Sequence, residues 1–72
     1  MALYVRIGEP ALLPELVTAL VRNGCVAQRV DSDACRVIHV FAGHAEEARR
    51  ELVFFVRAWQ LGHPGASAVV TH

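Results

Sequence analysis

The side chains of this chain that could do chemistry are seven arginines, four histidines and two cysteines. Four histidines in 72 residues raise the question of a metal site. His44 and His63, however, stand at the two ends of a predicted helix about 28 Å long and cannot share one ion. Cys25, His44 and His72 could meet at one edge of a small sheet only if loops reach across it. The sequence therefore favours structural roles for these residues and predicts no metal and no cofactor.

Nucleophilic catalysis needs a hydroxyl or thiol beside a base, and the sequence shows no such arrangement. The chain has no Gly-x-Ser-x-Gly turn and no glycine-rich phosphate loop. Its hydroxyl groups are few and scattered: Tyr4, Thr18, Ser32, Ser67 and Thr71. Glu9 and His63 could form an acid–base pair at one edge of a sheet, but such pairs are common on protein surfaces. A non-enzymatic protein is the favoured interpretation, and a small enzyme is the weaker alternative.

The formal net charge of the chain is zero, because it has seven arginines and seven Asp and Glu residues in total. Nucleic acid is therefore an unfavoured partner, since a dedicated nucleic-acid-binding protein normally carries a basic surplus. The apolar runs are shorter than the roughly 18 residues of a membrane span, and no secretion signal is visible. Cys25 and Cys35 lack the Cys-x-x-Cys spacing of redox and zinc sites. Two cysteines without this spacing are typical of a protein from a reducing compartment. We expect a cytoplasmic protein that does not enter a membrane.

The first part of the chain predicts a strand followed by a helix. Residues 3–7 alternate between apolar and polar side chains, and Gly8 ends this strand. A helix begins near Leu12, because apolar residues then recur at helical spacing and Pro14 falls within the first turn. Gly24 ends the helix, since glycine adopts the left-handed conformation of a helix C-cap.

The remaining residues complete a βαββαβ order. Residues 25–30 and 35–41 predict the two strands of a hairpin around a turn rich in Asp and Ser. Residues 44–61 predict a second helix, and residues 66–71 a last strand. Right-handed crossovers then give an α+β ferredoxin-like sandwich, with a four-stranded antiparallel sheet in the order 4-1-3-2 and two helices on one face. This single domain spans residues 1–72.

The tight turn predicts Arg29 opposite Arg36 and Val30 opposite Cys35 in the hairpin. The helices would then cover the face with the larger apolar side chains, which holds Val26, Gln28, Val30, Cys35, Val37, His39 and Phe41. The open face would hold Cys25, Ala27, Arg29, Arg36, Ile38 and Val40. A register shifted by one residue would exchange these faces and expose the valines as a dimer surface.

The expected open face carries a row of basic and aromatic side chains near one sheet edge. These are Tyr4, Arg6, Arg29 and Arg36. Like charges on neighbouring strands destabilise a sheet unless they are neutralised. Asp31, Asp33 or Glu9 could neutralise them within the chain. Alternatively, the row could bind an anion or a nucleic acid, with arginine forks on a carboxylate or phosphate and Tyr4 as a stacking surface.

The second predicted helix leaves an apolar stripe on its outer side. Phe54, Ala58 and Leu61 project there when Leu52 and Trp59 face the sheet. A domain of this size buries only about 60% of its unfolded surface, so association is a natural source of further burial. We therefore expect a homodimer that uses this stripe.

A partial family resemblance adds a function. The segment Glu9-Pro10-Ala11-Leu12-Leu13-Pro14-Glu15-Leu16, followed by Ala19-Leu20 and Gly24, resembles the first strand, turn and helix of ACT domains. ACT domains also share the βαββαβ order and a similar length. The resemblance implies a non-catalytic regulatory module that pairs with a second copy and binds a small ligand, often an amino acid. The implied ligand site is the turn formed by Gly8, Glu9, Pro10, Ala11 and Leu12.

Together, these features predict a stand-alone ACT-like regulatory or interaction module. We expect it to self-associate, to bind a small molecule such as an amino acid, and to accept a protein partner. Anion or nucleic-acid binding on the open sheet face is the alternative function.

Overall fold

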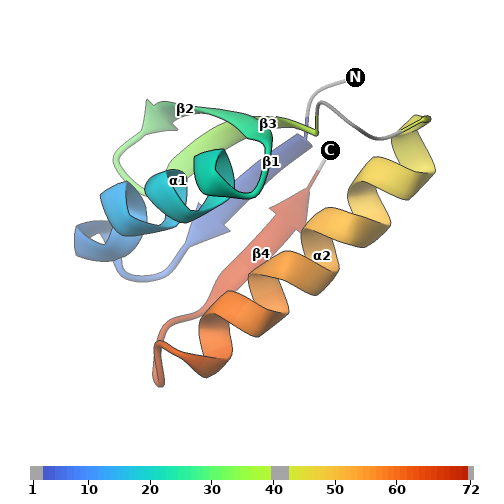
Figure 1. The fold of residues 1–72 in the computed structure, drawn as a ribbon. Coiled ribbons are helices and arrows are strands. Elements are labelled where there is room, and N and C mark those ends of the chain that lie inside the picture. Colours follow the sequence, from blue (N-terminus) through green and yellow to red (C-terminus); the bar gives the residue numbers. More distant parts are fainter. Residues whose placement is uncertain (1–2, 40–42, 72) are drawn as a thin grey trace.

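The computed structural model describes residues 3–39 and 43–71, which follow the predicted βαββαβ order (Figure 1). Its elements are β1 (Leu3–Ile7), the short 3-10 helix η1 (Pro10–Leu12), α1 (Leu13–Arg22), β2 (Cys25–Asp31), β3 (Ala34–His39), α2 (Ala45–Leu61) and β4 (Ala68–Thr71). β4 begins later than the expected Ala66. The predicted strand residues Val40 and Phe41 lie outside the described part of the chain, as does His72.

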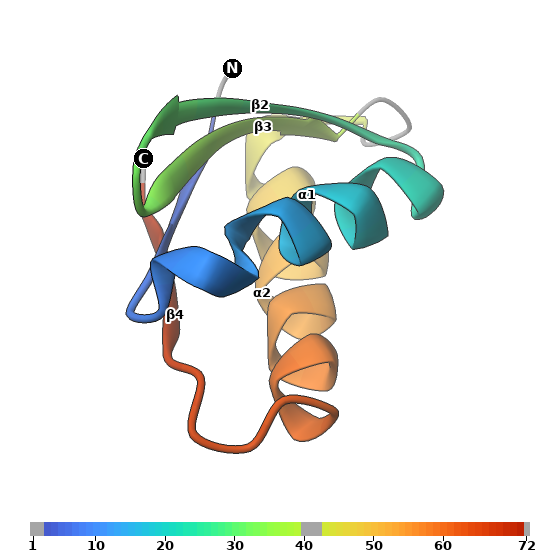
Figure 2. The same cartoon turned by 90° about the vertical axis from the view of Figure 1, so that its left-hand side faces the viewer.

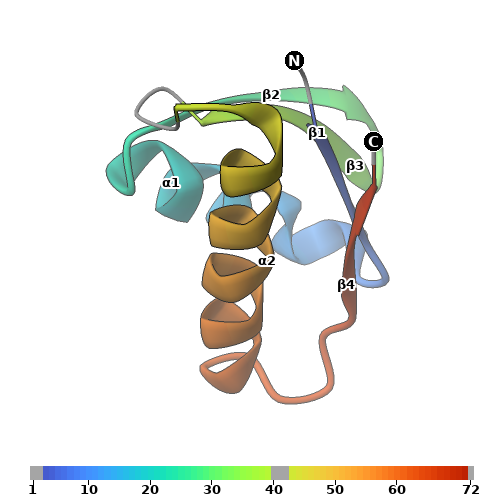
Figure 3. The ribbon, with the colours of Figure 1, turned by 90° about the vertical axis from the view of Figure 1, so that its right-hand side faces the viewer.

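The described strands form one antiparallel sheet in the order β2-β3-β1-β4, as predicted. Both helices cover the same face of this sheet (Figures 2 and 3). α1 packs against β2 and β3, whereas α2 packs against β3 and β4. The result is the ferredoxin-like α+β sandwich, with β2 and β4 as its edge strands and the second sheet face open.

Local chemistry sets the helix boundaries. Pro14 is the second residue of α1, where no amide partner is lost because the first four amides of a helix have none. Gly24 follows α1 with a φ of +88°, in the left-handed region. At the start of α2, Nδ1 of His44 accepts a hydrogen bond from the Glu47 amide at 3.2 Å. The Glu47 carboxylate in turn accepts from the Gly43 amide at 3.0 Å, so this side chain also ties the residue before the N-cap to the first turn of α2.

The core lies between the two helices and the covered sheet face. Each helix buries one stripe: Leu13, Leu16 and Leu20 from α1, and Leu52, Val56 and Trp59 from α2. The strands contribute Leu3, Val5, Ile7, Cys25, Cys35 and Val37. The prediction that Leu52 and Trp59 face the sheet is confirmed, and Ala48 and Phe55 also pack against this cluster.

The β2–β3 hairpin differs from the predicted register by one residue. Arg29 pairs with Cys35, and Gln28 pairs with Arg36, whereas turn chemistry alone predicts Arg29 opposite Arg36. The pairing shifts between Arg29 and Asp31, where a bulge adds one residue to β2. The predicted register is therefore wrong, and the cause is a local irregularity beside the turn.

The bulge inverts the faces of β2 but not those of β3. Cys35 and Val37 are buried against the helices, as predicted. On β2, however, Cys25 and Ala27 face the helices, and Val26 lies on the open face and is 53% exposed. The predictions that Val26 and Gln28 face the helices, and that Cys25, Ala27 and Arg29 lie on the open face, are wrong. Val30 lies at the bulge itself and is 52% exposed. An extra residue in one strand reverses every side chain beyond it.

Candidate functional site

The predicted ligand turn is a tight connection between β1 and α1. The Gly8 amide donates to the Ser67 carbonyl oxygen at 2.8 Å, and the Leu12 amide donates to the Glu9 carbonyl oxygen at 3.0 Å. A side chain on Gly8 would collide with the Ser67 hydroxyl unless that group turned away. The turn residues Glu9, Pro10 and Ala11 are exposed, and Gly8 lines a hollow on the open side of the sheet.

This hollow has a volume of about 370 Å³ and lies beside the end of β1. It is lined by Arg6, Ile7, Gly8, Asp33, Ser67, Val69 and Thr71. Nη1 of Arg6 donates to Oδ1 of Asp33 at 2.6 Å, so opposite charges stand side by side. The two side chains are 59% and 31% exposed, so the pair contributes at most about 1 kcal/mol to stability. The hollow therefore presents a cation and an anion to any ligand that enters it.

The structure does not gather the predicted row of arginines. Arg6 is neutralised by Asp33, which is one of the internal partners that the sequence left open. Arg29 pairs with a residue of the covered face, and its Nε donates to a carbonyl oxygen of its own hairpin at 3.2 Å. Tyr4 and Arg36 do lie opposite each other on the open face. The placement of Arg29 in this row is thus wrong, because the bulge turns it away.

The predicted self-association residues lie on the outer side of α2. Phe54 is 76% exposed and Leu61 is 85% exposed, with the exposed Ala58 between them. A hollow of about 380 Å³ adjoins this stripe and lies between α1 and α2. It is lined by Ala19, Arg22, Asn23, Phe55, Ala58 and Trp59. Ala58 therefore belongs both to the projecting stripe and to the hollow.

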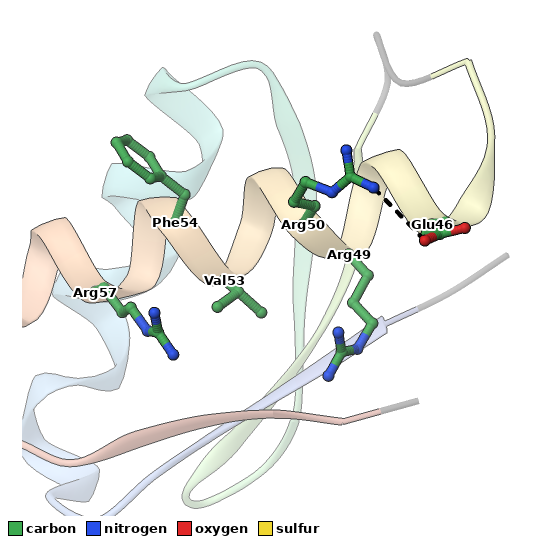
Figure 4. Close-up of a pocket in the computed structure, with 6 residues that line it drawn as sticks. All are labelled: Glu46, Arg49, Arg50, Val53, Phe54 and Arg57. Atoms are coloured by element: carbon green, nitrogen blue, oxygen red, sulfur yellow. Dashed lines mark ion pairs between the residues drawn. The ribbon is translucent and has the colours of Figure 1, made fainter.

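A second side of α2 carries cationic groups that the sequence analysis missed. Figure 4 shows Arg49, Val53 and Arg57 on the side of α2 that faces β4, whereas Phe54 points the other way. Among the described residues, neither Arg49 nor Arg57 forms an ion pair. The i, i+4, i+8 spacing of these three residues is a helical stripe that the sequence alone could have shown.

Arg50 lies closer to Phe54 than Arg49 does, and it forms an ion pair within α2. Its Nη2 is 3.5 Å from Oε1 of Glu46, one turn earlier in α2 (Figure 4). A hollow of about 380 Å³ along this part of the helix is lined by Glu46, Arg49, Arg50, Val53, Phe54 and Arg57. The outer surface of α2 is thus apolar along one stripe and cationic along the next.

His63 links the end of α2 to the beginning of α1. Its Nε2 lies 2.8 Å from Oε1 of Glu15, and its Nδ1 lies 2.9 Å from the Trp59 carbonyl oxygen. The imidazole also stacks on the Trp59 ring, with 4.1 Å between centroids. Two hydrogen bonds raise the pKa of His63: the bond to Glu15 has the larger effect, and the bond to the Trp59 carbonyl has the smaller one. Glu15, not the expected Glu9, is therefore the acidic partner of this histidine.

The cysteines and the other potential metal ligands are not gathered into a site. Cys25 and Cys35 are buried free thiols, and burial raises the pKa of both. No group of three His, Cys, Asp or Glu side chains within residues 3–39 and 43–71 could hold a metal ion. In the same part of the chain, no helix has both the length and the apolar character of a membrane span.

Comparison of the chain with protein-family models, curated proteins and solved structures found no match. The resemblance to ACT domains stays a prediction that rests on its own residues.

Proposed function

We propose that this protein is a non-enzymatic interaction module that pairs with a second copy of itself through the outer side of α2. One observation carries the proposal: the exposed stripe of Phe54 and Leu61 adjoins an apolar hollow between the helices. A two-fold interface must be complementary to itself. This surface meets that condition, because it has both a projecting aromatic ring and a hollow lined by Phe55, Ala58 and Trp59.

The geometry of the pair follows from these positions. Phe54 of one copy enters the hollow of the other, and the two-fold axis repeats the contact. Ala58 allows the α2 helices of the two copies to approach closely, since its side chain is a single methyl group. Burying a large apolar side chain contributes about 1.5–3 kcal/mol, and symmetry doubles each contribution. The ACT-like segment supports the same proposal, because that resemblance implies pairing with a second copy.

Replacement of Phe54 tests this proposal. In size-exclusion chromatography with light scattering, we expect the wild-type protein to have the mass of a dimer and Phe54→Asp to have the mass of a monomer. The matched control is Val26→Asp, which places the same charge at an exposed valine on the open sheet face. The control should remain a dimer. A monomeric wild-type protein, or a dimeric Phe54→Asp variant with an unchanged circular dichroism spectrum, would contradict the proposal.

The hollow beside Gly8 supports a second candidate function, the binding of a small zwitterion such as a free amino acid. Arg6 and Asp33 match the carboxylate and the ammonium group of such a ligand, and the volume of about 370 Å³ is within the range of small-molecule sites. Titration with free amino acids should shift the amide resonances of Gly8 and Ser67. Arg6→Gln should abolish these shifts, whereas Arg36→Gln should preserve them. Equal loss in both variants would argue against the site.

A further inference from the structure

β4 is an edge strand whose four residues include no charged residue, no proline and no bulge. Native proteins protect their edge strands with charged residues, proline or bulges. The opposite edge, β2, has a charged residue in Arg29 and a bulge beside it. β4, by contrast, consists of Ala68, Val69, Val70 and Thr71, and pairs with β1 in a regular register. Its outer side is therefore a template for a further strand.

The pairing pattern identifies the backbone groups that such a strand would bind. The Gly8 amide donates to the Ser67 carbonyl oxygen, so Ser67 exchanges hydrogen bonds with the β1 side. Residues of an antiparallel pair alternate between bonded and non-bonded positions. Val69 consequently also faces β1 with its backbone. Ala68 and Val70 direct their N–H and C=O groups away from the sheet, toward the free edge.

An apolar groove of about 230 Å³ accompanies this edge, between β4 and α2. It is lined by Val53, Val56, Arg57, Gln60, Ala68, Val69 and Val70. Every second residue of a strand paired with β4 would point to the helix side of the sheet. Such a residue would contact Val53, which projects toward β4 (Figure 4).

Arg49 and Arg57 determine which side chains fit on either side of the residue that contacts Val53 in the added strand. Arg49 and Arg57 lie one helical turn before and after Val53 on the side of α2 that faces β4 (Figure 4). Residues four apart in a helix are separated by about 6 Å along its axis, and residues two apart in a strand by about 6.6 Å. Three successive helix-facing residues of the strand would thus meet Arg49, Val53 and Arg57 in turn.

The same charges disfavour a second copy of this chain as the occupant. A two-fold axis that paired two β4 strands would run between their free edges, beside the groove that Val53 and Arg57 line. The arginines of one α2 would then approach those of the other, and juxtaposed like charges oppose association. Acidic residues at those two positions would instead pair with arginines that have no ion pair among the described residues.

We infer that the free edge of β4 and the stripe of Arg49, Val53 and Arg57 form a docking site for an extended segment of a partner protein. The segment has an acidic, an apolar and an acidic residue at every second position, and it binds by adding a strand to the sheet. Phe54 borders one hollow with Arg49, Val53 and Arg57 but points away from β4 (Figure 4). The groove beside β4 shares no lining residue with the hollow between the helices. Its occupation does not depend on self-association.

A short fluorescein-labelled peptide with the pattern Glu-x-Val-x-Glu, with threonine at the intervening positions, is the probe. Fluorescence anisotropy should show saturable binding to the full chain. Arg49→Glu and Arg57→Glu should each weaken binding about tenfold, which corresponds to about 1.4 kcal/mol. The matched control is Arg36→Glu, which changes the net charge equally but lies on β3, and its affinity should stay within about twofold of wild type. Phe54→Asp should bind the peptide as the wild-type protein does.

Two further probes test the strand pairing itself. The same peptide N-methylated at alternate amides should lose binding in the frame that blocks the edge of β4, and a peptide with lysine in place of glutamate should not bind. The amide resonances of Ala68 and Val70 should shift with the acidic peptide. The inference is overturned if the acidic peptide does not bind, if both N-methylated frames bind equally, or if Arg36→Glu weakens binding as much as Arg49→Glu. Displacement of the peptide by a short single-stranded RNA at lower concentrations than by unlabelled peptide would also overturn it.

Discussion

His63 lies between two hydrogen-bond acceptors, and this arrangement favours its protonated form. The Glu15 carboxylate faces Nε2, and the Trp59 carbonyl oxygen faces Nδ1. Only the doubly protonated ring can donate from both nitrogens at once. The folded protein therefore favours the imidazolium, which accords with the raised pKa of His63. The ring is 23% exposed, so the contact remains open to solvent titration.

This contact predicts a pH dependence with a definite sign. A group whose pKa is raised by folding stabilises the protein fully below its unfolded pKa, near the ordinary value of 6.5. That contribution declines as pH rises through the higher folded pKa. In urea denaturation, the difference in unfolding free energy between wild type and Glu15→Gln should shrink across this range. The NMR titration midpoint of His63 should also fall in the variant. A pH-independent difference would contradict this assignment.

The hairpin shows how one element determines which side chains become available for contact. The bulge between Arg29 and Asp31 turns Ala27 toward the helices and Val26 toward solvent. Compared with the predicted register, the open sheet face therefore carries the aliphatic side chain of Val26 and lacks the guanidinium group of Arg29. α2 likewise has separate sides, since Phe54 lies on an apolar stripe and Arg57 on a cationic one. The candidate surfaces are thus properties of whole elements.

The face assignment of β2 can be tested with neighbouring substitutions. Ala27→Asp places a carboxylate against the core and should lower the unfolding free energy by about 3 kcal/mol or more. Val26→Asp places the same group on the open face and should cost about 1 kcal/mol or less. Urea denaturation of both variants measures the difference. The opposite order of stabilities would restore the register predicted from the turn alone.

At the scale of the whole molecule, one small core must stabilise both helices against a four-stranded sheet. The core residues of α1 and α2 pack onto the sheet, yet an apolar hollow remains between the helices at Phe55 and Ala58. A chain of 72 residues has little additional surface to bury within itself. Filling this hollow from a second copy would couple folding to association.

Such coupling predicts a concentration-dependent thermal transition. A partner that binds only the folded state stabilises it by about 2.7 kcal/mol at 100 times its Kd. The Tm of the wild-type protein should therefore rise over a roughly 100-fold increase in protein concentration. The Tm of Phe54→Asp should be the same across that range. Thermal unfolding followed by circular dichroism distinguishes these outcomes, and a constant wild-type Tm would contradict the proposed pairing.

The sequence by itself determined the order of the elements and most of the core. Strand and helix periods are local, so the alternation of residues 3–7 and the stripe of Leu52, Val56 and Trp59 are visible without any tertiary contact. The end of the first helix is equally local, because Gly24 takes a left-handed conformation that other residues avoid. The outward position of Phe54 follows from the same helical period.

The tertiary structure alone decided which residues meet across elements. The bulge in β2 places Cys25 and Ala27 on the covered face of the sheet, and the turn sequence alone does not show that Arg29 leaves the predicted row. The pairing of His63 with Glu15 joins residues far apart in the chain, and no local pattern encodes that distance. The groove beside β4 likewise exists only when α2 is packed over the edge strand. Long-range contacts depend on the packing of whole elements, which residue periodicity does not specify.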